Sequence, residues 1–101
     1  MQDYNIERVG KPDLVFSGDL IGQSGSDRPR VKIYRTKAAK FVAVLSVDAQ
    51  RAEADHFDKP ADVVNWLRAH LNSITPEAQA AIEDAAKKDD SFKAFWTERV
   101  D

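Results

Sequence analysis

The hydrophobic pattern changes its period halfway along the chain, and this change constrains the fold more than any other feature. In the first half, apolar and polar residues alternate, which is typical of half-buried β-strands. In the second half, apolar residues recur every three or four positions, as they do in amphipathic helices. Strands followed by helices predict an α+β fold with the helices packed on one face of an antiparallel sheet. Because the connections are too short for parallel crossovers, we expect a β-meander of three to four strands.

The first predicted strand covers about residues 13–21 and carries Leu14, Phe16 and Leu20 on one face. Gly18 interrupts this strand, which indicates a bulge or the close approach of another backbone. A segment rich in glycine and serine follows at residues 22–29, and its composition predicts a loop.

Two further strands are predicted at residues 31–36 and 41–47. The second of these is apolar on both faces, which is typical of a central strand. After a tight turn at residues 48–49, the segment 50–57 predicts a fourth strand. The predicted sheet therefore ends near residue 57.

Three helices are predicted, at about residues 60–72, 76–88 and 91–99. Pro60 suits a first helical position, and Thr75 suits an N-cap that precedes a first-turn proline. Ser91 is the expected N-cap of the last helix. We expect the 101 residues to form one domain.

Composition excludes several classes of protein. The chain has no cysteine, so a disulfide framework, a thiolate metal site and a cysteine nucleophile are excluded. The formal net charge of −2 gives no overall bias toward nucleic acid or membranes. The first residues lack the apolar core of a signal peptide, which favours a cytoplasmic protein. We expect no cofactor, no bound metal and no catalytic residues.

One segment is strongly basic although the whole chain is slightly acidic. Between residues 28 and 40 there are six bases and no acid. A basic β-hairpin would contact phosphates of a nucleic acid or an acidic protein partner, and Tyr34 would stack on an unpaired base. Alternatively, the bases line a solvated strand edge. The candidate contacts are Arg28, Arg30, Lys32, Tyr34, Arg35, Lys37 and Lys40.

The chain contains two histidines, His56 and His70. His70 follows Trp66 by four residues on a predicted helix, so the two rings are expected to touch. Neither histidine belongs to a metal-ligand motif, but either could serve a small ligand carrier or an enzyme.

Aromatic residues gather near the C-terminus. The helix expected at residues 91–99 is too short to be stable without tertiary contacts, so its aromatic side chains belong either to the core or to an exposed protein interface. The candidate interface residues are Phe92, Phe95, Trp96 and Trp66.

The segment 14–21, the Gly/Ser loop after it, and the stretches Ile33–Thr36 and Phe41–Val42 resemble small uncharacterised bacterial proteins. The resemblance covers the first half of the chain and implies a bacterial or phage origin, and it identifies no active site, ligand or partner. The leading hypothesis is a non-enzymatic protein-interaction or regulatory module without membrane association. Nucleic-acid binding and ligand carriage are the alternatives, and an uncovered edge strand would permit a homodimer.

Overall fold

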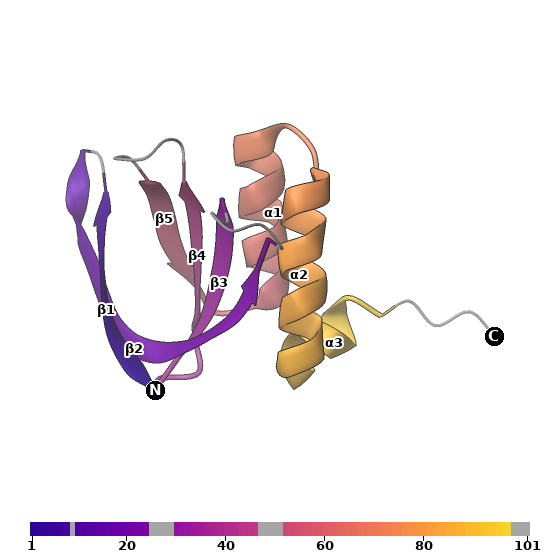
Figure 1. The fold of residues 1–101 in the computed structure, drawn as a ribbon, viewed down its shortest axis with the longest axis horizontal. Coiled ribbons are helices and arrows are strands. Elements are labelled where there is room, and N and C mark those ends of the chain that lie inside the picture. Colours follow the sequence, from indigo (N-terminus) through magenta and orange to yellow (C-terminus); the bar gives the residue numbers. More distant parts are fainter. Residues whose placement is uncertain (9, 25–29, 47–51, 98–101) are drawn as a thin grey trace.

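The computed structural model describes residues 1–8, 10–24, 30–46 and 52–97. The described strands are β1 (Gln2–Arg8), β2 (Lys11–Gln23), β3 (Val31–Thr36), β4 (Phe41–Ser46) and β5 (Ala52–Phe57). The helices that follow are α1 (Pro60–Leu71), α2 (Pro76–Lys88) and α3 (Asp90–Phe95) (Figure 1). The strands form one antiparallel sheet in the order β1-β2-β3-β4-β5. The α+β meander is confirmed, but the expectation of three to four strands is wrong because the described residues form five.

The strand that sequence analysis missed is β1. Its inward residues Tyr4 and Ile6 alternate with exposed polar residues, so it carries only two apolar side chains. It pairs with the first half of β2, where Tyr4 faces Phe16 and Ile6 faces Leu14. A weak period-two pattern therefore becomes a strand because an adjacent, stronger strand supplies its hydrogen bonds.

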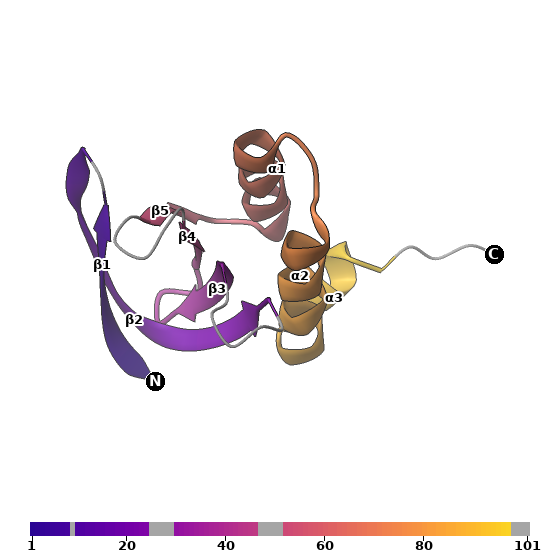
Figure 2. The ribbon, with the colours of Figure 1, turned by 45° about the horizontal axis from the view of Figure 1, so that its top comes forward.

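The long strand β2 connects two layers of the molecule. Its first half pairs with β1, its second half pairs with β3, and Gly18 takes part in both pairings. A Cβ atom at Gly18 would lie 2.2 Å from the carbonyl oxygen of Arg35, so only glycine permits this approach. In Figures 1 and 2, β1 and the first half of β2, which we call the hairpin layer, lie on one side of β3–β5, and the helices lie on the other.

This layering explains why both faces of β4 are apolar. Phe41, Ala43 and Leu45 point toward the helices, whereas Val42 and Val44 point toward the hairpin layer. All five side chains are buried. The expectation of a central strand at this position is confirmed.

The helices begin where the capping signals predict. Pro60 starts α1, and Thr75 caps α2 by accepting a hydrogen bond from the Ala78 N–H. The alanine-rich face of α2 approaches β2 closely, since a Cβ atom at Gly22 would lie only 2.3 Å from the Ala81 carbonyl oxygen. Gly22 therefore belongs to β2 and not to the predicted loop at residues 22–29. Small residues on both elements let the helix lie directly on the strand.

The third helix is shorter than predicted and begins at a different cap. It ends at Phe95, and its N-cap is Asp89, whose carboxylate accepts a hydrogen bond from the Phe92 N–H at 3.1 Å. The same carboxylate forms an ion pair with Arg35 of β3. As the N-cap, an aspartate that also pairs with an arginine stabilises the helix more than Ser91 would. The turn predicted at residues 48–49 and the predicted helix end at residues 98–99 lie outside the described residues.

Arg8 joins the hairpin layer to the last strand of the sheet. Its Nε donates to the carbonyl oxygen of Pro12 at 2.8 Å, and its Nη1 donates to the carbonyl oxygen of Ala54 in β5 at 3.2 Å. The hairpin layer is therefore fastened to β5 near its turn.

Candidate functional site

An open groove lies between the hairpin layer and the central sheet. It has a volume of about 470 Å³, within the range typical of ligand pockets. Its apolar lining comes from Leu14 and Phe16 of β2 and from Val42 of β4. Its polar rim includes Lys37 and Lys40 of the β3–β4 connection and His56 of β5. The groove therefore combines an apolar floor with a basic rim.

Strand alternation and register position the groove residues. Leu14 and Phe16 lie two apart on β2 and point inward, but both remain half-buried. Val42 pairs with His56 across β4 and β5, so His56 lies on the same face of the sheet as the apolar floor. Ala52 and Ala54 also pack on the hairpin side, so they share this face with His56. His56 itself is exposed at the groove.

Two carboxylates lie close to the polar side chains of the groove. Asp58 Oδ1 is 3.2 Å from Lys40 Nζ, and both side chains are largely exposed to solvent. Ser17 Oγ donates a hydrogen bond to Asp3. Exposed ion pairs of this kind contribute little to stability and are readily exchanged for other partners. The charge on Lys40 is therefore accessible to a ligand.

An aromatic cluster supports the floor of the groove. The rings of Tyr4, Phe16 and Tyr34 pack against one another with centroids 4.7–5.2 Å apart. Burial raises the pKa of Tyr34, and the neighbouring Tyr4 raises it further. With 4% of its surface exposed, Tyr34 has no face free to stack on a base, so that predicted role is wrong.

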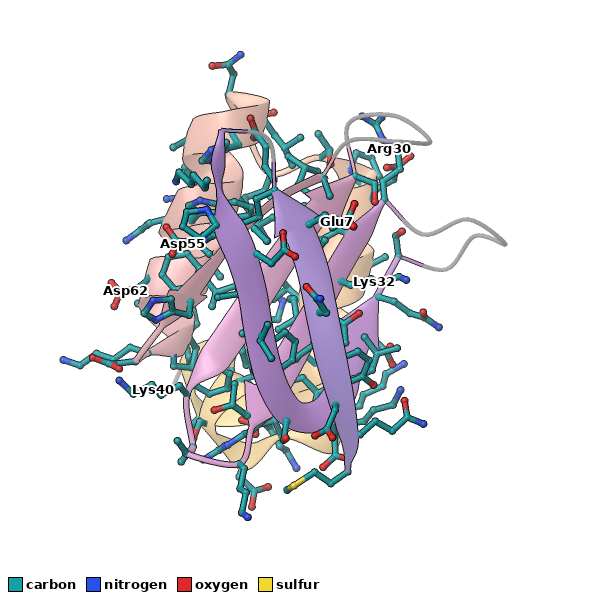
Figure 3. All side chains as sticks on the ribbon, turned by 90° about the vertical axis from the view of Figure 1, so that its left-hand side faces the viewer. Glu7, Arg30, Lys32, Lys40, Asp55 and Asp62 are labelled. Carbon is teal, nitrogen blue, oxygen red and sulfur yellow. The ribbon has the colours of Figure 1, made fainter. Side chains whose placement is uncertain are left out.

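The basic segment does not form a separate hairpin, because β3 is paired on both sides. In Figure 3, Arg30 and Lys32 lie on one side of the view and Lys40 lies on the other. Arg30 Nε is 3.9 Å from Glu77, and the Arg35 guanidinium pairs with the buried Asp89. The structure thus disperses the predicted phosphate contacts, and only Lys37 and Lys40 line the same groove. Arg28 lies outside the described residues, and nucleic-acid binding stays a prediction.

The structure separates the predicted aromatic interface into two parts. Phe92 is fully buried and meets Phe41 edge-on at 5.1 Å, so its assignment to an exposed surface is wrong. Trp66 is partly buried against the same core. Phe95 is 43% exposed and lies beside the half-buried Trp96. Only the last two residues present aromatic surface at the C-terminal end of the described chain.

The rings of His70 and Trp66 touch, as their spacing predicts, with centroids 4.4 Å apart and planes tilted by 40°. Its Nδ1 lies 2.9 Å from the Trp66 carbonyl oxygen and its Nε2 lies 3.4 Å from Glu53. Both ring nitrogens thus have partners within the protein. His70 and His56 therefore lie in different environments, and His56 is the one that lines the groove beside the hairpin layer.

The groove could not be found from the sequence because its residues come from distant segments. Leu14 and Phe16 lie on β2, whereas His56 lies on β5, and two other strands separate them along the chain. No sequence motif links them. The available signals were the face shared by Leu14 and Phe16 and the bases at Lys37 and Lys40. These signals meet only because β2 bends across the sheet.

Three comparisons with known proteins give no further information on this site. No protein-family model matches the chain, and no curated protein or solved structure is significantly similar to it. Within the described ranges, no cluster of three or more metal-ligating side chains occurs. No helix in that part of the chain has the length and hydrophobicity needed to cross a membrane. The resemblance to small bacterial proteins stays a prediction.

Proposed function

We propose that this protein is a binding protein that holds a small amphipathic molecule in the groove between its hairpin layer and its central sheet. The observation that carries the proposal is an open groove of about 470 Å³ whose floor is made of apolar side chains from both layers. Leu14 and Phe16 stay half-buried although they face the interior. A ligand's apolar part would cover this surface and gain the free energy of its burial.

Binding without catalysis is the proposal that the rim chemistry supports. The rim supplies two ammonium groups, which carry positive charge, and an imidazole, which donates hydrogen bonds. Ser17 Oγ, a hydroxyl in the groove lining, donates to Asp3 and not to a histidine. A nucleophilic serine would require a hydrogen-bonded base. The groove is therefore better suited to recognition than to covalent chemistry.

A ligand titration followed by amide NMR tests this function. We expect straight-chain compounds of about ten carbons to shift the amide signals of Leu14, Phe16, Val42 and His56, which line the groove. Signals of α2 should stay in place. A panel that shifts no groove signal, or shifts only signals elsewhere, would refute the proposal.

A blocking variant adds a second test. Ala38 is exposed in the β3–β4 connection and lines the groove, so Ala38→Trp would fill the groove without disturbing the core. We expect at least about tenfold weaker binding, a loss of about 1.4 kcal/mol in binding free energy. Ala69→Trp, at an exposed position on α1, is the matched control and should bind normally. Equal binding by both variants would contradict the assignment.

A second candidate function, the binding of a protein partner, is supported by α3. Phe95 is 43% exposed, and a groove of about 500 Å³ beside it is lined by Trp96, Lys87, Lys93 and Glu83. Two lysines against one glutamate around a tryptophan favour an acidic segment with an apolar side chain.

A photoreactive residue at position 95 tests this second function. It should give one discrete cross-linked product with a partner in lysate of the native host. That product should disappear when Lys87 and Lys93 are both changed to glutamate. The same probe at Ala69, which is also exposed, is the control. A product that survives the charge reversal would contradict an acidic partner.

A further inference from the structure

The charged side chains that line the groove are basic, although Asp58, outside the lining, pairs with Lys40. Lys37, Lys40 and His56 all line the groove, and no carboxylate belongs to its lining. The whole chain carries a formal net charge of −2, so this local excess of basic groups is opposite to the overall balance. A rim that concentrates positive charge next to an apolar floor distinguishes between ligands by their head groups.

The two lysines differ in their surroundings. Lys40 Nζ lies 3.2 Å from Asp58, in a pair whose side chains are 51% and 74% exposed. Lys37 forms no ion pair with any side chain of the described residues. An incoming anion would therefore meet one lysine directly and would compete with Asp58 for the other. Exposed pairs such as Lys40–Asp58 are weak enough for this exchange.

The backbone holds the rim in a fixed position relative to the floor. Lys37 N–H donates to the Ser17 carbonyl oxygen at 2.8 Å, which ties the β3–β4 connection to β2. Lys40 N–H donates to Thr36 Oγ1 at 3.0 Å, which closes that connection on itself. Both lysines therefore lie on an ordered turn. Little backbone entropy is lost when their side chains bind a ligand.

We infer that the ligand of this groove is an amphipathic anion, with an apolar body between the two layers and a carboxylate, sulfonate or phosphate head at Lys37, Lys40 and His56. This inference rests on the function proposed above and adds the class of ligand. The ammonium groups would pair with the anionic head, and the imidazole would donate a hydrogen bond to it. A neutral or cationic head would leave the same apolar contacts but lose these interactions.

Three ligands that share the same alkyl tail but differ in their head groups test the inference. We would titrate the protein with decanoate, decanol and decyltrimethylammonium, below their micelle concentrations, and measure Kd by NMR. Decanoate should bind about tenfold or more tightly than decanol, since charge-assisted hydrogen bonds exceed neutral ones. Decyltrimethylammonium should bind most weakly.

The lysines are tested by the double variant Lys37→Gln with Lys40→Gln. Both side chains are exposed, so this variant should fold normally. Its affinity for decanoate should fall to that for decanol, while its affinity for decanol stays unchanged. The matched control is Lys59→Gln with Lys88→Gln, at two exposed lysines outside the groove, of which Lys88 also forms a partly exposed ion pair; it should keep the preference for decanoate.

The outcomes separate the two levels of the proposal. If none of the three compounds binds in the groove, the proposed function fails and the inference fails with it. If all three bind equally, the groove binds ligands but does not select anions, so only the inference is overturned. A preference for decanoate that persists in the Lys37/Lys40 double variant would likewise overturn the assignment of the head-group site.

Discussion

The two faces of the central sheet are covered in different ways. On the helix side, Ile33, Phe41, Leu67, Ile82 and Phe92 are at most 2% exposed. On the hairpin side, inward-facing Leu14, Phe16 and Leu20 remain only partly buried. The helix side is therefore a closed core, whereas the hairpin side leaves apolar surface along an open groove. The difference suggests that the closed side stabilises the fold and the open side is available for a ligand.

The largest expected effect comes from truncating one phenylalanine on each side. Phe92→Ala should lower the free energy of unfolding by about 3–5 kcal/mol, because it leaves a cavity in a closed core. Phe16→Ala should cost about 1–2 kcal/mol, because that ring is already partly solvated. Urea denaturation measures both losses. Equal losses would show that the two sides contribute alike and would refute the comparison.

The next largest effect is expected at Asp89, which ties the helix side together. Its carboxylate caps α3 and pairs with Arg35, so Asp89→Ala removes both contacts. We expect a loss of about 2–3 kcal/mol in the free energy of unfolding, measured in urea. Asp89→Asn should cost less because asparagine also caps helices.

Asp58→Ala is the matched control for Asp89, since it removes one partner of the exposed pair with Lys40. It should change stability by no more than about 0.5 kcal/mol. A similar loss from both aspartates would contradict the role assigned to burial at Asp89.

A smaller and more local effect is expected at Arg8, which fastens the hairpin layer to β5. Arg8→Ala should cost about 1 kcal/mol, the usual net value of such hydrogen bonds. Amide hydrogen exchange should become faster in β1 and in the first half of β2 but should not change in α2. Uniformly faster exchange would show that the hairpin layer does not open separately.

The smallest effect is a pH dependence at Tyr34. Because burial raises its pKa in the folded state, its phenol ionises more readily in the unfolded chain. Its stabilising contribution is complete below the unfolded pKa of about 10 and is lost as the pH rises above that value. We expect the urea midpoint of the wild type to fall more steeply between about pH 9 and 11 than that of Tyr34→Phe. Parallel curves would contradict the burial of this hydroxyl.

Sequence patterns predicted the helix side well and the hairpin side poorly, for a physical reason. Pro60, Thr75 and Pro76 are local signals, and they set the starts of α1 and α2 where predicted. The change of pairing partner along β2, at Gly18, depends on contacts with a distant strand, and the bend of β2 across the sheet creates the second layer. No local pattern reveals such a bend, so the groove and the burial of Tyr34 remained hidden.

Sequence patterns placed some candidate site residues correctly and others incorrectly. The difference again lies between local patterns and contacts of distant segments. His56 was predicted to lie on a strand at residues 50–57, and its place opposite Val42 on β5 puts it in the groove lining. Phe92 was considered for an interface because helical spacing alone does not show which turn of a short helix meets the core. Its contact with Phe41 decides the matter, and that contact joins residues far apart in the chain.

The Arg8 contact also bears on how the sheet avoids continuing into a second molecule. A meander has two free edges, and each edge offers unpaired backbone groups to another strand. At β5, the carbonyl oxygen of Ala54 already accepts a hydrogen bond from the Arg8 guanidinium. At β1, the exposed side chains include Asp3 and Glu7, and antiparallel pairing of two copies about Asn5 would set these carboxylates opposite each other. Both edges thus oppose the edge-to-edge association from which β-rich aggregates grow.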